Sequence, residues 1–118
     1  SLGLFLNNIE EALIRTLAKF NIGARRRPGM RGIWVKEEKI ASVGIGADRW
    51  VSLHGFALNI NTDLAFFDKI RPCGLDVRMS SMQSCLGGSV DLASVKEAVV
   101  SETAEIFQLI NKNQCVFA

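Results

Sequence analysis

Residues 32–45 read GIWVKEEKIASVGI, and this stretch decides the fold. Two apolar segments that contain β-branched residues, 32–35 and 39–45, flank the charged triplet Lys36-Glu37-Glu38. Such segments are typical of strands, and a short charged break between two of them is typical of a hairpin. We therefore predict two strands joined by a hairpin turn at residues 36–38.

A longer strand is expected downstream, from Trp50 to Ile60. Polar Ser52, His54 and Asn59 are embedded there among apolar residues. Gly55 interrupts the pattern, which suggests a bulge or a close approach of the backbone to another group.

Helices are predicted on both sides of these strands. Upstream, apolar residues recur at near-helical spacing at Ile9, Leu13, Leu17 and Phe20. Asn7 followed by Glu10 resembles a capping arrangement, and Gly23 is expected to stop this helix. Residues 24–29 are predicted to be a polar loop that ends in the turn dipeptide Pro28-Gly29.

The downstream part is predicted to contain short irregular segments and a final helix. Residues 64–67 are expected to form a short helical turn, and residues 84–89 a loop. The final helix should start near Ser89 or Asp91, with an apolar stripe of Leu92, Val95, Val99, Ile106, Leu109 and Ile110. Strands bounded by helices at each end predict an α+β fold, with a mixed or antiparallel sheet packed against helices.

Composition narrows the function classes. The hydrophobic share of 48% in 118 residues is enough for the core of one domain, or of a large piece of one. The net charge of +2 is too small to imply nucleic acid or an anionic membrane surface as a partner. No apolar run approaches the roughly 20 residues that span a bilayer. The start resembles no signal peptide and lacks an initiator Met, so we expect a fragment or a processed product.

Cysteine usage points to a reducing compartment and away from metals. The three cysteines, Cys73, Cys85 and Cys115, are widely spaced and form no C-x-x-C pair. A secreted disulfide scaffold is therefore not expected. A single His beside scattered cysteines also makes a poor zinc site, so we expect no metal.

Cys73 is the candidate nucleophile. Pro72 restricts the backbone just before it, and Gly74 leaves room just after it. A substrate carbonyl could thus reach the sulfur, and a backbone N–H could face a developing oxyanion. The same surroundings suit a structural turn, and free cysteines are often buried and inert. The residues alone leave both interpretations open.

Lys39 and His54 are the candidate proton partners of this thiol. Lys39 opens an apolar strand, where it could act as a base or, as a cation, favour the Cys73 thiolate. Beside Glu37 and Glu38 it could equally be a solvated lysine at a strand edge. His54 could form a Cys–His pair, or be a hydrogen-bonded histidine of the sheet.

Three further features are less specific. The run Arg25-Arg26-Arg27 could be a solvated loop or a docking patch for an acidic protein partner. Trp34 and Trp50 are interpreted as packing residues rather than as ligand-stacking ones. The segment Ser42-Val43-Gly44 could bring bare backbone against a ligand.

Three blocks of this sequence together resemble the lipoyl(octanoyl) transferase family. The first runs from Arg27-Pro28-Gly29 through Gly32-Ile33-Trp34-Val35 to Lys39-Ile40-Ala41-Ser42-Val43-Gly44. The second is residues 50–61, WVSLHGFALNIN, and the third is residues 70–75, IRPCGL. Any one block is weak evidence, but the three in this order make a specific resemblance that covers about residues 1–83 well.

The resemblance implies an α+β fold like the catalytic domains of biotin protein ligases and lipoate ligases. Residues 1–118 would be the C-terminal part of a single catalytic domain, incomplete at its N-terminus. The family's N-terminal half contains an Arg-Gly-Gly stretch and a histidine–glycine motif that do not occur here. We therefore expect the isolated chain to be inactive or poorly folded.

The implied activity is transfer of an octanoyl group from acyl carrier protein to a lysine of a lipoyl domain, without any cofactor. The implied acceptors are the lipoyl domains of 2-oxo acid dehydrogenases and the glycine cleavage H protein. Neither nucleic acid nor a membrane is expected as a partner, and we expect a monomer. The expected location is the cytoplasm, with a mitochondrial or plastid matrix as the alternative.

The resemblance also assigns roles to residues. Cys73 would carry the acyl group as a thioester, and Lys39 would favour its thiolate. Substrate contacts fall on two segments, Ser42, Val43 and Gly44 in one, and Gly55, Phe56 and Ala57 in the other. Two alternatives stay open: a non-catalytic fragment that binds acyl carrier or lipoyl partners, and a thiol hydrolase that uses Cys73 with His54.

Overall fold

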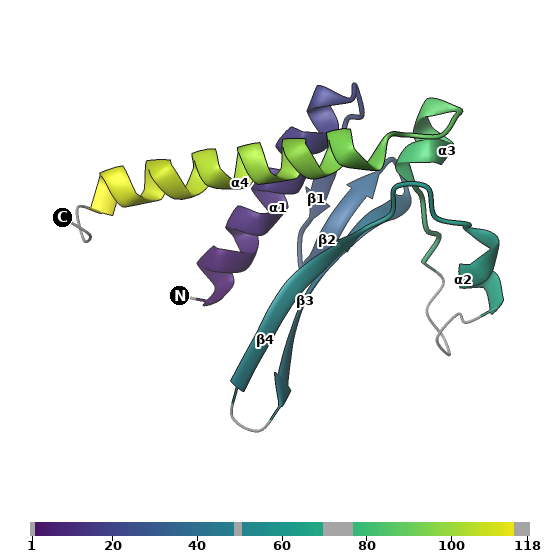
Figure 1. The fold of residues 1–118 in the computed structure, drawn as a ribbon. Helices are drawn as coiled ribbons and strands as arrows, with labels where there is room; N and C mark the ends of the chain where they lie inside the picture. The colour runs from purple at the N-terminus through teal and green to yellow at the C-terminus, as the bar shows by residue number, and fades with distance from the viewer. Residues whose placement is uncertain (1, 49–50, 70–76, 115–118) are drawn as a thin grey trace.

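The structure is a computed structural model that describes residues 2–48, 51–69 and 77–114. In these ranges the helices are α1 (Leu2–Lys19), α2 (Ala65–Lys69), α3 (Met82–Leu86) and α4 (Leu92–Gln114). The strands are β1 (Arg25–Arg27), β2 (Met30–Val35), β3 (Glu38–Asp48) and β4 (Val51–Leu58), and they form one antiparallel sheet in the order β1-β2-β3-β4 (Figure 1).

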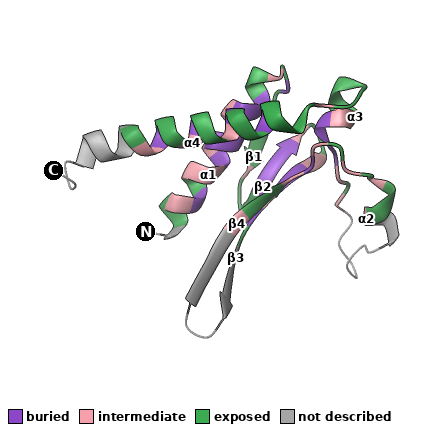
Figure 2. Ribbon diagram, viewed as in Figure 1, coloured by how far each residue is buried: buried purple, intermediate pink, exposed green. Residues whose placement is uncertain are grey.

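The helices and the sheet form two layers. Helices α1 and α4 contact each other, and α1 packs on β2 and β3 (Figure 1). The buried residues concentrate where these elements meet (Figure 2), while strands β3 and β4 extend away from the helices (Figure 1). The core is apolar and is built by Leu6, Leu13, Leu17, Ile22, Ile33, Ile40, Ala41, Val43, Met82 and Val95. The predicted α+β arrangement is thus confirmed.

The predicted hairpin is confirmed and is longer than expected. β2 and β3 pair on either side of the turn at Lys36 and Glu37, and Lys36 takes a positive φ of 54°. A bulge lies between Ile33 and Trp34, where the register shifts. The bulge or close approach expected at Gly55 is wrong, because β3 and β4 pair without a shift and nothing lies within 4 Å of a Cβ added at Gly55.

The loop expected at residues 24–29 is wrong in part, because Arg25–Arg27 form strand β1. This strand pairs with β2 through Arg25↔Trp34 and Arg27↔Met30, and Gly29 turns the chain with a φ of 76°. Arginines are not typical strand residues, but ion pairs to Glu10, Glu11 and Glu37 accommodate their charges here. The strand is therefore a consequence of tertiary contacts.

Both expected ends of the first helix are wrong. α1 begins at Leu2, so Asn7 and Glu10 lie inside it rather than at a cap. Helix α1 ends at Lys19, and the left-handed residue after it is Asn21, with a φ of 62°, rather than Gly23. Asparagine tolerates this conformation better than most residues, which explains the earlier stop.

The C-terminal part follows the prediction in α2, where a helical turn was expected at residues 64–67, and in its last helix. Residues 84–86, expected in a loop, belong to α3, which Ser81 caps at its start and Gly87 at its end. α4 starts after Asp91 as predicted. Of the predicted stripe, Val95 and Ile106 are buried and Val99 packs against the core, whereas Leu92 is 49% exposed and does not belong to it. Ala98 and Glu102 are buried as well, and the side chains of Leu109 and Ile110 lie outside the described part.

Asp91 and Glu102 are the two carboxylates that fix α4. The hydroxyl of Ser94 donates to Asp91 at 2.7 Å, and this bond, aided by backbone N–H donors, lowers the pKa of the Asp91 carboxyl. Glu102 is buried and pairs with Lys19 of α1 at 2.9 Å. Among the described residues, none of the helices is both long and apolar enough to cross a membrane.

Candidate functional site

Lys39 is held by its backbone between two segments that are far apart in sequence. Its N–H donates to the Arg78 carbonyl at 2.8 Å, and its own carbonyl accepts from the Ser80 N–H at 2.7 Å. Lys39 and Met79 thus form a parallel bridge beside β3, which makes the pairing mixed at this point. The chain that follows residues 70–76 therefore returns directly alongside the predicted proton partner.

The Lys39 side chain is half-buried against Trp34. Its Nζ lies 5.4 Å from the centroid of the indole ring, within the range of a cation–π contact. Trp34 is only 1% exposed, which confirms its packing role. The Arg27 guanidinium lies 5.2 Å from the same ring.

The two predicted substrate segments lie directly opposite each other on β3 and β4. The register pairs Ser42 with Ala57, Val43 with Phe56, and Gly44 with Gly55. Val43 is buried, whereas Phe56 is 44% exposed. A Cβ added at Gly44 or Gly55 would meet nothing within 4 Å. The structure thus pairs two segments that are eleven residues apart at their nearest ends (Gly44 to Gly55), and the pair Gly44–Gly55 is sterically open.

Several predicted site residues lie outside the described part of the chain. Cys73 and Trp50 fall in undescribed segments, as does Cys115. The His54 backbone pairs with Ile45, but its side chain is outside the description. The roles of Cys73 and of a Cys–His pair therefore stay predictions.

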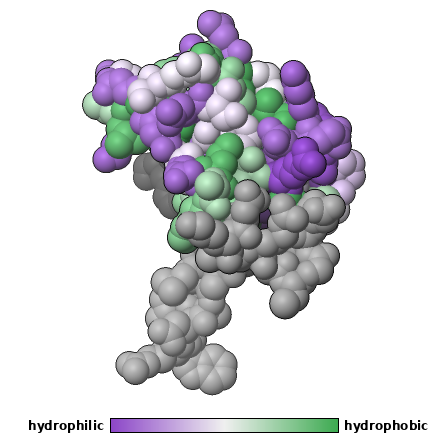
Figure 3. Space-filling view, turned by 90° about the vertical axis from the view of Figure 1, so that its right-hand side faces the viewer, coloured by the Kyte–Doolittle hydropathy of each residue, from purple (hydrophilic) through white to green (hydrophobic). Residues whose placement is uncertain are grey.

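A depression of about 500 Å³ adjoins the Lys39 backbone, and the sequence did not point to it. It lies between the start of β3, the α2 region and the returning segment, and is lined by Glu38, Leu64, Ala65, Phe67, Val77, Arg78 and Met79. The short apolar run at residues 64–67 was the one available signal. On the face seen in Figure 3, hydrophobic and hydrophilic residues are intermixed over the described surface instead of forming one continuous apolar patch.

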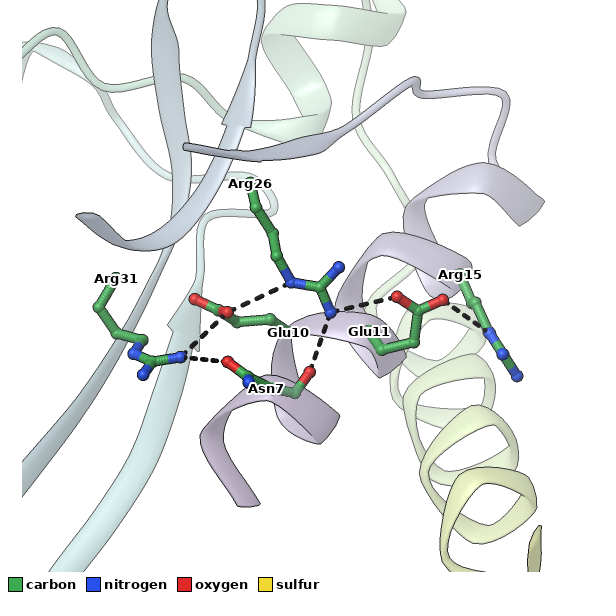
Figure 4. A network of polar contacts seen from close by, with 6 residues as sticks. All are labelled: Asn7, Glu10, Glu11, Arg15, Arg26 and Arg31. Atoms are coloured by element: carbon green, nitrogen blue, oxygen red, sulfur yellow. Dashed lines mark hydrogen bonds and ion pairs between the residues drawn. The ribbon is translucent and has the colours of Figure 1, made fainter. Parts of the chain in front are cut away.

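The arginine run makes ion pairs within its own chain. Arg26 pairs with Glu10 at 3.4 Å and with Glu11 at 3.2 Å, and Arg31 pairs with the same Glu10 at 3.2 Å (Figure 4). Arg25 and Arg27 both reach Glu37. This pairing leaves less uncompensated positive charge for an acidic partner than the run of three arginines suggests.

Glu10 is the exception in this otherwise exposed network. Its side chain is 3% exposed, and besides the arginines it accepts the Gly32 N–H at 2.9 Å. A buried carboxylate needs such partners, because an unpaired charge in the interior is strongly disfavoured. No motif pointed to this residue as a link between α1 and β2.

Comparisons with known proteins identify the family of this chain. The family model described as lipoyl protein ligase A/B catalytic domain matches residues 2–104. An octanoyltransferase of Thermoanaerobacter sp. (strain X514) is 42% identical over 105 residues, which are 88% of this chain and 46% of the relative. One from Desulfovibrio desulfuricans is 45% identical over 106 residues, covering 88% and 45%. The chain thus spans just under half the length of these curated relatives.

Solved structures show the same fold at low sequence identity. A crystal structure of lipoate-protein ligase A bound with ATP has a TM-score of 0.71 at 17% identity, covering 92% of this chain and 47% of that one. The apo biotin protein ligase from Aquifex aeolicus has a TM-score of 0.60 at 17% identity, covering 86% and 41%. The expected likeness to lipoate and biotin ligase catalytic domains is confirmed, and the chain belongs to the lipoyl protein ligase A/B catalytic domain family.

Proposed function

We propose that this chain is the C-terminal part of an octanoyltransferase, which moves an octanoyl group from acyl carrier protein to a lysine of a lipoyl domain. The observation that carries the proposal is the 42% identity to an octanoyltransferase over 105 residues. We propose residues 1–118 as the C-terminal part of a single catalytic domain, in keeping with a match to 46% of that relative. The acceptors proposed are the lipoyl domains of 2-oxo acid dehydrogenases and the glycine cleavage H protein.

The reaction has two balanced steps. In the first, the Cys73 thiolate attacks the donor thioester carbonyl, a new S–C bond forms, and the carrier thiolate leaves. In the second, the acceptor amine attacks the Cys73 thioester, an amide forms, the amine loses a proton and the Cys73 thiolate is released. The donor thioester already carries the activation, so no ATP is consumed. The covalent intermediate divides one exchange between two protein partners into two easier steps.

Lys39 is proposed as the group that favours the Cys73 thiolate. It is also proposed as the proton partner of the thiol in both steps. Its support is its place in the chain: its backbone is bonded to Arg78 and Ser80, and Cys73 precedes Arg78 by only five residues. A cation near a thiolate stabilises it by Coulomb attraction.

The paired segments Ser42–Gly44 and Gly55–Ala57 are proposed as the surface that accepts the octanoyl chain. Their two opposed glycines leave open space, Ala57 lies on the same face of the strands as these glycines, and Phe56 is an exposed apolar side chain of the same strand. An alkyl chain requires such an apolar, sterically open surface.

The test is mass spectrometry of the full-length gene product after incubation with octanoyl-acyl carrier protein. We expect one octanoyl adduct on Cys73, lost in Cys73→Ser and retained in Cys85→Ser, which removes an exposed cysteine as the matched control. Lys39→Met should slow adduct formation. The proposal is wrong if no adduct forms, or if the adduct persists in Cys73→Ser.

A further inference from the structure

The strand pair around Gly32 is unusually crowded. Gly32 has a φ of 130°, a conformation that side-chain-bearing residues rarely adopt. A Cβ added there would lie 2.7 Å from Lys39 Cε and 2.9 Å from the Ala41 carbonyl oxygen. The stem of Lys39 therefore passes over a position that only glycine leaves free.

Trp34 forms the other side of this path. It is the registered cross-strand partner of Lys39, and the added Cβ at Gly32 would also lie 3.3 Å from its Cζ3 atom. Its indole Nε1 is buried and has no acceptor in the described ranges, so packing and the two nearby cations orient the ring. Arg27, one of those cations, is already paired with Glu37 at 2.7 Å. Lys39 Nζ forms no ion pair with any described residue, so the indole face is its electrostatic contact.

Hydrogen bonds to other segments fix the backbones of Gly32 and Lys39. The N–H of Gly32 donates to the buried Glu10 carboxylate of α1 at 2.9 Å. The same carboxylate lies between Arg26 and Arg31 (Figure 4). The Lys39 backbone is bonded on its other side to Arg78 and Ser80. With both backbones held, the direction of the Lys39 side chain depends on Gly32 and Trp34.

We propose that Gly32 and Trp34 are positioning residues that direct the Lys39 ammonium to the site of acyl transfer. Gly32 acts by leaving room for the lysine stem, and Trp34 acts by holding the ammonium over its ring. The inference rests on the proposed function through the role of Lys39, and neither residue touches the acyl group.

The first test is single-turnover thioester formation on Cys73 by the full-length gene product, corrected for the folded fraction. Gly32→Ala should slow the reaction by about 10- to 100-fold, since misplacing a catalytic group by roughly 1 Å costs up to about 100-fold. Trp34→Phe should slow it less. Gly29→Ala is the matched control, because Gly29 also has a positive φ of 76° but nothing lies within 4 Å of the added Cβ; we expect it to keep the parent rate.

The second test separates positioning from general stability. In a Lys39→Met background, Gly32→Ala and Trp34→Phe should cause no further slowing, because each acts through the lysine. The rate–pH profile of Gly32→Ala should also move towards that of Lys39→Met, whereas a loss of folded protein lowers the rate without changing that profile.

The outcomes are distinguishable. Multiplicative losses in the double variants, or an unchanged rate–pH profile, would overturn the positioning role while leaving the proposed function intact. A parent-like rate in Lys39→Met would instead overturn the proposed role of Lys39, and the inference with it. If Gly32→Ala does not fold, the comparison of Trp34→Phe with and without Lys39→Met tests the positioning role by itself.

Discussion

Gly32 and the pair Gly44–Gly55 are glycines of one sheet in opposite surroundings. At Gly32 an added Cβ would meet a lysine stem and a backbone oxygen below 3.0 Å, whereas at Gly44 and Gly55 it would meet nothing within 4 Å. The first glycine allows two strands and a side chain to pack closely. The second pair leaves a surface open. The sheet is therefore closely packed at Gly32 and sterically open at Gly44 and Gly55, and both places adjoin the candidate site.

The largest expected effect is a loss of stability at the closely packed glycine, Gly32. Gly32→Ala combines an unfavourable φ with overpacking, each costing roughly 1–3 kcal/mol, so we expect the free energy of unfolding to fall by about 3 kcal/mol. Gly44→Ala should change it by less than about 1 kcal/mol. Urea denaturation of both variants of the full-length gene product measures the difference. Equal losses would remove the contrast between the two glycines.

The next effect concerns the buried carboxylate that holds Gly32. Glu10→Ala removes the acceptor of a buried N–H and the partner of two arginines, so a loss of about 1–3 kcal/mol is expected. Its neighbour is the control: Glu11→Ala removes more exposed pairs, to Arg15 and Arg26, and should cost at most about 1 kcal/mol. Denaturation midpoints that match for the two variants would contradict a special role for Glu10.

The open space at Gly44 and Gly55 is tested by filling it with a larger side chain. Gly44→Val would occupy the space proposed for the alkyl chain, and we expect kcat/KM for octanoyl transfer to fall about tenfold, the scale of a lost methylene contact or two. Transfer of a butyryl group should fall less. Steady-state assays with both carrier-bound donors check this. A uniform loss for both chain lengths would place the acyl chain elsewhere.

The smallest effect is expected at the start of α4, which belongs to neither glycine environment. The lowered pKa of Asp91 means that its contribution is complete above its ordinary value of 3.8 and is lost as the pH falls through the lower folded value. Asp91→Ala should therefore lower Tm slightly at pH 7 and by less as the pH approaches 3. A difference that grows on acidification would show that the charge of Asp91 does not stabilise the cap.

A further expectation concerns the chain alone. In the described residues β4 pairs only with β3, so one long edge of the sheet is open. We expect the isolated 118-residue chain to be inactive in octanoyl transfer, and to associate with itself more than the full-length gene product does. Activity assays and light scattering at equal concentration test both statements.

The sequence by itself determined the elements that depend on neighbours in the chain. Apolar segments with β-branched residues predicted β2, β3 and β4, the charged triplet predicted the turn at residues 36–38, and helical periodicity predicted α1 and α4. The motif blocks also named both segments that pair on β3 and β4, and Lys39. Local periodicity and turn chemistry are properties of short windows, so one sequence is enough to reveal them.

Only the tertiary structure decided which distant residues these elements contact. Strand β1 pairs with β2, and its three arginines are compensated by Glu10, Glu11 and Glu37, which no local pattern predicts. The register that sets Gly44 against Gly55, the return of Arg78–Ser80 beside Lys39, and the path of the Lys39 stem over Gly32 all join distant residues. Such contacts depend on packing summed over the whole chain, which a motif does not contain.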